Sequence, residues 1–108
     1  MKPASAKKKG KRLEIKVARE WRSKTKDLSI RTPGSGSGKH KGDVYNRHFS
    51  IECKNQEKVR LWEWWQQAVN QKGFNKPPAL MISGNYRPIL VVMDLDDWLN
   101  LVLEAKYE

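Results

Sequence analysis

Residues 42–54, with the sequence GDVYNRHFSIECK, form the stretch that most strongly constrains the fold. Val44 and Tyr45 are typical of a short strand, and residues 48–55 alternate in polarity as a half-buried strand does. One face of this second strand holds the apolar residues Phe49, Ile51 and Cys53. The other face holds Ser50, Glu52 and Lys54. We therefore expect the apolar face to pack on the core and the charged pair to point to the opposite side.

Asp43 stands just before the first of these strands, so it can come close to Glu52 and Lys54 on the neighbouring strand. Carboxylate oxygens are ligands that Mg²⁺ prefers, and Mg²⁺ polarises a phosphodiester and lowers the pKa of an attacking water. A positioned ammonium stabilises developing negative charge or orients the nucleophile. The residues therefore predict Asp43 and Glu52 as metal ligands and Lys54 as a catalytic cation.

The segment before this stretch divides into a basic arm, a helix, a strand and a loop. Residues 1–12 contain six Lys and Arg and no acid, which is typical of a disordered arm that holds a phosphate backbone or of a solubilising tail. Residues 11–24 have apolar side chains at helical spacing. Residues 28–32 alternate as a short strand and lead into the loop PGSGSG at 33–38. We expect a flexible arm over 1–12 and one folded domain over 13–108.

The second half of the chain predicts two helices and a hairpin. Residues 61–71 predict a helix, and residues 79–83 and 89–93 predict the two strands of the hairpin. The apolar stripe of that helix consists of Leu61, Trp62, Trp65, Ala68 and Val69, and Trp64 falls outside it. Asp94 can cap a last helix. The packed face expected for the last helix consists of Trp98, Leu101, Val102 and Ala105. The predicted order is α-β-β-β-α-β-β-α, an α/β domain with a central mixed sheet flanked by helices.

The spacing of the three charged residues resembles the signature of the PD-(D/E)xK nuclease superfamily. Asp43 is followed by eight residues and then by Glu52-Cys53-Lys54, which matches an acid, a spacer, and an acid two residues before a lysine. Gly42 stands where the superfamily name has proline, a position that shapes backbone and performs no chemistry. The resemblance implies a restriction-endonuclease-like single domain that uses Mg²⁺, with Mn²⁺ as a substitute, and the backbone carbonyl of Cys53 as a further ligand.

Within that superfamily, the chain is similar to archaeal and phage Holliday junction resolvases over roughly residues 9–70. Lys9-Gly10 precedes Glu14 at the spacing of these enzymes, and Arg31 leads into a Gly/Ser loop before the first metal-binding acid. The similarity implies that Glu14 is an auxiliary acid, with Glu20 as an alternative. It also implies phosphate contacts by Arg31, by Ser35 or Ser37, and by Gln56, which extends the strand face of the signature.

Charge indicates a polyanionic partner, because 22 Lys and Arg outnumber 12 Asp and Glu for a net charge of +10. The loop residues Lys39, His40 and Lys41 are predicted to contact phosphate, and Lys58 and Arg60 to extend the basic surface. The loop lacks the spacing of a nucleotide-binding P-loop, so no nucleotide cofactor is expected. A lone cysteine excludes an intrachain disulfide, and with two histidines it excludes a structural zinc cluster.

No apolar run reaches the roughly 18 residues of a membrane span, and the basic start is not followed by a signal-type apolar stretch. We therefore expect no membrane partner and a cytoplasmic protein associated with nucleoid or phage DNA.

The resemblance implies a structure-specific endonuclease, a Holliday junction resolvase that cuts four-way junctions in DNA recombination and repair. A two-fold homodimer suits the symmetry of that substrate, with Trp64 as the candidate interface residue. One alternative is another PD-(D/E)xK activity, restriction-like or specific for single strands. The other is a non-catalytic basic DNA-binding module, which would not need Asp43, Glu52 and Lys54.

Overall fold

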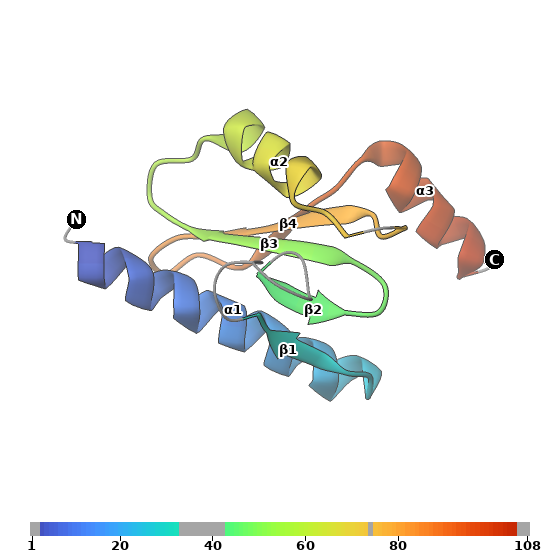
Figure 1. The fold of residues 1–108 in the computed structure, drawn as a ribbon, viewed down its shortest axis with the longest axis horizontal. Coiled ribbons are helices and arrows are strands. Elements are labelled where there is room, and N and C mark those ends of the chain that lie inside the picture. The colour runs from blue at the N-terminus through green and yellow to red at the C-terminus, as the bar shows by residue number, and fades with distance from the viewer. Residues whose placement is uncertain (1–2, 33–42, 74, 106–108) are drawn as a thin grey trace.

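The computed structural model of the chain describes residues 3–32, 43–73 and 75–105, and Figure 1 shows how their helices and strands are arranged. The helices are α1 (Pro3–Thr25), α2 (Leu61–Asn70) and α3 (Leu95–Glu104). The strands are β1 (Ser29–Arg31), β2 (Val44–Asn46), β3 (Ser50–Asn55), β4 (Pro78–Ser83) and β5 (Leu90–Val92). The predicted order of elements is confirmed.

The strands form one mixed sheet in the order β1-β2-β3-β4-β5. β1, β2 and β3 pair antiparallel, β3 and β4 pair in parallel, and β5 returns antiparallel to β4. A parallel pair requires a crossover connection, and α2 lies within it. The arrangement confirms the predicted hairpin and gives a small α/β domain that is consistent with a restriction-endonuclease-like fold.

The main core lies between α1 and the sheet. It consists of Leu13, Val17 and Ala18 from α1 against Val44, Ile51, Cys53, Ala79 and Met81 from the strands. On β4, Leu80 lies between two of these residues and therefore faces the other side, where Trp64 and Ala68 of α2 are buried. Helices thus cover both faces of β3, so its polar residues Ser50 and Glu52 are buried as well.

Helix α1 begins at Pro3, and the prediction of a disordered arm over 1–12 is wrong for residues 3–12. Proline at the first helical position has the right φ and lacks only an N–H that the helix would not use. The alanines and lysines that follow have high helix propensity. The prediction rested on the basic composition of residues 1–12, and a run of basic residues can also form a helix.

The buried face of α2 differs from the predicted one. Trp64 is 5% exposed and Trp62 is 78% exposed, so the assignment of Trp64 to an outer interface and of Trp62 to the core is wrong. Trp65 is partly buried. The apolar side chains of α2 span a wide arc of the helix, and the sheet meets one edge of that arc, at Trp64 and Ala68, while Trp62 lies at the other edge.

We expect Trp64→Ala to lower the free energy of unfolding by roughly 3–5 kcal/mol, because the indole leaves a cavity between α2 and the sheet. The measurement is urea unfolding followed by circular dichroism. Glu63→Ala, an exposed position on the same helix, serves as the control and should change the value by less than about 0.5 kcal/mol. Equal effects of the two changes would contradict the assignment of the buried face.

Helix α3 is capped as predicted, since the Asp94 side chain accepts a hydrogen bond of 2.8 Å from the N–H of Asp96. Its predicted packed face is not packed: Trp98 is 52% exposed, and none of the residues of α3 is buried. An apolar stripe predicts that a helix face will be buried, but it does not show which element will bury it. No helix in the described part of the chain combines the length and apolar character needed to cross a membrane.

Candidate active site

A pocket of about 330 Å³ opens beside the second half of β3, between α1 and α2. In the described chain, β2 pairs with β3 only as far as Val44 and Ile51, so the pocket begins where that pairing ends. The lining residues are Gly10, Glu14, Asp43, Glu52, Cys53, Lys54, Asn55, Gln56, Gln67 and Gln71. The three charged residues of the predicted signature therefore line one pocket.

Asp43 is fixed by hydrogen bonds at the point where β2 begins. Its N–H donates to the carbonyl of Ile51 over 2.7 Å, and its own carbonyl accepts from the N–H of Thr32 over 2.8 Å. Its carboxylate Oδ2 accepts a hydrogen bond of 2.8 Å from the N–H of Cys53. The carboxylate thus takes the place of a strand partner for β3 and is held beside the charged residues of that strand.

Glu52 is almost fully buried, and its pKa is raised to about 7. Burial is the largest cause of this shift, the negative charge of Asp43 adds to it, and the ammonium of Lys54 opposes it. Burial also raises the pKa of Asp43, and the hydrogen bond from Cys53 opposes that shift. Two carboxylates in one buried place repel each other, so the pocket favours a bound proton or a cation.

Lys54 follows Glu52 by two residues on β3 and lines the same pocket. Its ammonium lowers the pKa of both neighbouring carboxyl groups, so its charge acts on the site. Cys53, between them, turns its thiol into the core, where burial raises the pKa of that thiol. The alternation predicted for this strand thus places charge at the pocket and sulfur in the core.

Glu14 lines the pocket from α1 and is paired with Arg31 of β1, whose Nε lies 2.7 Å from Oε1 of Glu14. Burial and the charge of Asp43 raise the pKa of Glu14, and Arg31 lowers it. Glu20, the alternative auxiliary acid, is exposed and does not line the pocket. Of the two acids on α1, Glu14 is therefore the one at the site, and Arg31 compensates its charge.

The donor set fits a hard divalent cation that keeps part of its water shell. Oε1 of Glu52 is buried and has no hydrogen-bond partner among the described residues, a position that a cation would stabilise. The carbonyl of Cys53 points to the same side of β3 as its N–H, which donates to Asp43. Within the described ranges, no three Asp, Glu, His or Cys side chains gather tightly enough to hold a metal alone. Water or substrate oxygens would complete the coordination.

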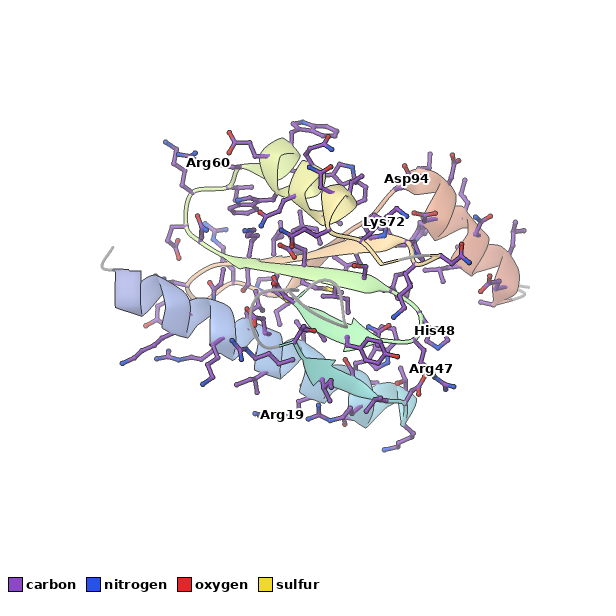
Figure 2. The ribbon with its side chains drawn as sticks, in the orientation of Figure 1. Arg19, Arg47, His48, Arg60, Lys72 and Asp94 are labelled. Atoms are coloured by element: carbon purple, nitrogen blue, oxygen red, sulfur yellow. The ribbon has the colours of Figure 1, made fainter. Side chains whose placement is uncertain are left out.

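The other residues predicted to contact DNA fall into three groups: in the pocket, outside the pocket, and outside the described residues. Gln56 lines the pocket. Lys58 and Arg60 are exposed between β3 and α2, outside the pocket, and Figure 2 shows Arg60 in the segment that leads into α2. The guanidinium of Arg60 lies 3.6 Å from the carboxylate of Glu63. Ser35, Ser37, Lys39, His40 and Lys41 lie outside the described residues. His48 lies at the β2–β3 turn, at the opposite end of the molecule from Arg60 in Figure 2.

Four pocket residues were missed by sequence reasoning: Gly10, Asn55, Gln67 and Gln71. Gln67 lies on α2 and Gln71 is the C-cap residue four positions later, so the two lie on the same side of the helix. Had the buried line Trp64–Ala68 been known, both amides would have been expected at the edge of the buried face. Asn55 donates a 3.4 Å hydrogen bond to the carbonyl of Lys9, which ties β3 to α1 beside the pocket.

We expect Gln71→Ala to reduce the DNA cleavage that the signature predicts by roughly tenfold, because an amide at the pocket wall would no longer bind water or phosphate. Its partial burial implies little loss of stability. Gln66→Ala on the exposed side of α2 is the matched control and should leave cleavage unchanged. The measurement is the initial rate of DNA cleavage together with the melting temperature, and identical rates for both variants would exclude a role for the Gln71 amide.

Residues 5–108 match the family model described as "Phage putative PDDEXK endonuclease". No curated protein and no solved structure matches the chain. The family match covers every residue of the pocket and agrees with the superfamily that the signature resembles.

Proposed function

Because the chain belongs to the phage PDDEXK endonuclease family, we propose that it is a Mg²⁺-dependent, structure-specific DNA endonuclease that resolves four-way junctions by phosphodiester hydrolysis. The observation that carries the hydrolytic part is the convergence of Asp43, Glu52 and Lys54 on one pocket. Support for the junction as substrate comes from the resolvase-like spacing of Lys9-Gly10 and Glu14, and Glu14 lines that same pocket.

Each charged residue of the pocket has a proposed task. Asp43 and Glu52, with the carbonyl of Cys53, would hold the cation, which supplies Lewis acidity and an activated water when bound. Mn²⁺ favours the same oxygen ligands and is expected to substitute. The Lys54 ammonium stabilises charge on the scissile phosphate. Glu14, oriented by Arg31, contributes an auxiliary carboxylate from the α1 side.

We propose DNA contacts outside the pocket because the chain carries a large excess of basic residues. The net charge of +10 supports binding to the phosphate backbone, which depends steeply on salt. Contacts are assigned to Gln56, Lys58 and Arg60 and to the segment of Ser35, Ser37, Lys39, His40 and Lys41. Arg31 would reach phosphate only by sharing its guanidinium with Glu14. A cytoplasmic location with phage or nucleoid DNA follows from this substrate.

The test is cleavage of a synthetic four-way junction by the unmodified protein, beside a linear duplex and a single strand of the same sequence. We expect paired cuts in the junction with Mg²⁺ or Mn²⁺, and binding without cleavage in Ca²⁺ or EDTA. Equal cleavage of the linear duplex would rule out a preference for junctions, and the protein would then be another kind of PD-(D/E)xK nuclease. Binding without cleavage of any substrate in any divalent ion would leave a DNA-binding module and overturn the proposed activity.

A further inference from the structure

The side of α1 that faces away from the sheet is exposed and strongly basic. The other side of the helix packs on the sheet, where Leu13, Val17 and Ala18 are buried. The exposed residues recur every three or four positions and form what we call the outer face of α1: Lys8, Arg12, Ile15, Lys16 and Arg19. Figure 2 shows Arg19 on the side of α1 away from the sheet, across the molecule from Arg60.

The positive charge of the outer face is not compensated by acids. Residues 8–26 contain nine Lys and Arg and only two Glu. One of these acids, Glu14, lies on another side of α1 and pairs with Arg31. Within the described residues, the four basic side chains of the outer face form no ion pair. Much of the net charge of the chain is therefore concentrated on one helix and is available to a ligand.

The spacing of these charges works against the helix that carries them. Arg12 lies four positions after Lys8 and four before Lys16, and like charges at this spacing destabilise a helix. A helix face that is only solvated often alternates the sign of its charges, so that neighbours four positions apart attract each other. The outer face keeps a repulsion that a bound polyanion would relieve, which favours a ligand over simple solvation.

The length of the basic row fits a nucleic-acid backbone. From Lys8 to Arg19 it extends over roughly 16 Å of helix, at about 1.5 Å per residue. A DNA duplex of that length carries roughly ten phosphates, at about one per 1.7 Å of axis. An amphipathic helix that binds a membrane buries an apolar side in the lipid, whereas the apolar side of α1 already packs on the sheet and Ile15 is the one apolar member of the outer face. The surface thus fits DNA better than a membrane.

The outer face and the catalytic pocket lie on different sides of α1. Glu14 lines the pocket, and Arg12 and Arg19 point roughly 140–160° away from it around the helix, at 3.6 residues per turn. None of the residues of the outer face lines the pocket. A duplex is stiff over such short lengths, because its persistence length is about 50 nm. One straight segment cannot contact both sides of α1, whereas two segments of a branched substrate can.

We propose that the outer face of α1 binds the phosphate backbone of a second duplex segment of the substrate, separate from the segment whose scissile phosphate enters the catalytic pocket. Arg12 and Arg19 are its central contacts, and Lys8 and Lys16 extend them. The inference rests on the proposed function for DNA as the ligand and adds a binding surface outside the pocket. Backbone contacts carry no base information, so this surface responds to the shape of the substrate and not to its sequence.

The test compares two double variants of the full chain in binding to a synthetic four-way junction in Ca²⁺. Arg12→Gln/Arg19→Gln should bind at least about tenfold more weakly, with the slope of log K against log salt concentration reduced by roughly 2. Lys72→Gln/Arg87→Gln removes the same charge from exposed positions outside the outer face and the pocket, and its affinity should change by less than about threefold. Hydroxyl-radical footprinting should show two separate protected stretches, of which the first variant loses one.

Circular dichroism checks that both variants fold, which the exposure of all four positions predicts. Equal weakening in the two variants would show that only net charge matters, and loss of both protected stretches together would show a single bound segment. Either result would overturn the inference. So would unchanged junction binding by Arg12→Gln/Arg19→Gln with loss of its binding to phosphatidylserine vesicles, which would assign the outer face to a membrane.

These measurements need no cleavage, so they separate the inference from the proposed function. A protein that shows the expected binding and footprints but cuts no DNA would overturn the nuclease activity and leave the outer face as a DNA-binding surface. A protein that cuts junctions but binds them equally well in both double variants would do the reverse. Absence of junction binding by the unmodified protein would overturn both.

Discussion

Replacing Asp43 with asparagine is expected to lower the rate of DNA cleavage in Mg²⁺ by on the order of 1,000-fold or more, because a neutral amide is a poor ligand for a hard cation. The fold should survive, since the asparagine carbonyl can still accept the hydrogen bond that the Cys53 N–H now donates to Asp43. Binding of a four-way junction in Ca²⁺ or EDTA should persist, because basic residues outside the pocket supply most of the attraction.

The measurement is single-turnover cleavage with an electrophoretic binding assay on the same preparation. Asp96→Asn removes an exposed carboxylate from α3 and provides the matched control, with an unchanged rate expected. Cleavage by Asp43→Asn at the rate of the unmodified protein would contradict the metal site. Loss of both binding and folding would instead show that Asp43 acts through its hydrogen bond to the N–H of Cys53 on β3. A melting curve of the variant distinguishes this loss of folding from a loss of metal binding.

Replacing Glu52 with glutamine is expected to abolish cleavage to a similar extent while stabilising the metal-free protein above neutral pH. The pKa of Glu52 is raised to about 7 in the folded state by burial and by the charge of Asp43, from an ordinary value of 4.5. Its contribution to stability is thus fully present below about pH 4.5 and is lost as the pH rises through about 7. Glutamine remains neutral and avoids that loss.

We therefore expect Glu52→Gln to raise the free energy of unfolding at pH 8 by roughly 1–3 kcal/mol, and to leave it nearly unchanged at pH 4. The measurement is thermal unfolding in EDTA across this pH range, with Glu63→Gln, an exposed glutamate, as the control. Addition of Mg²⁺ should stabilise the unmodified protein and not the variant. If the variant matched the unmodified protein at pH 8 both in stability and in its response to Mg²⁺, then the ionised Glu52 would not destabilise the fold and Glu52 would not be a metal ligand.

Sequence patterning predicted β3 and the placing of Glu52 and Lys54 on one face of it, because the two-residue period of a strand links neighbours in sequence to a shared face. Glu52 and Lys54 line the pocket and Cys53 joins the core, as that period requires. It predicted the orientation of α2 badly. The apolar arc of α2 is wider than the part that meets the sheet, so Trp64 at one edge is buried and Trp62 at the other edge is exposed.

The sequence by itself determined the order of elements, the hairpin, the cap at Asp94 and the spacing that links Asp43 to Glu52, since each depends on local geometry or on residues close along the chain. Only the tertiary structure decided the pairing of Glu14 with Arg31, the amides that α2 adds to the pocket, and the apolar face that α3 leaves in water. These features depend on how separate elements are oriented against each other. The hydrophobic effect sets those orientations but is not directional, so a local sequence pattern does not specify them.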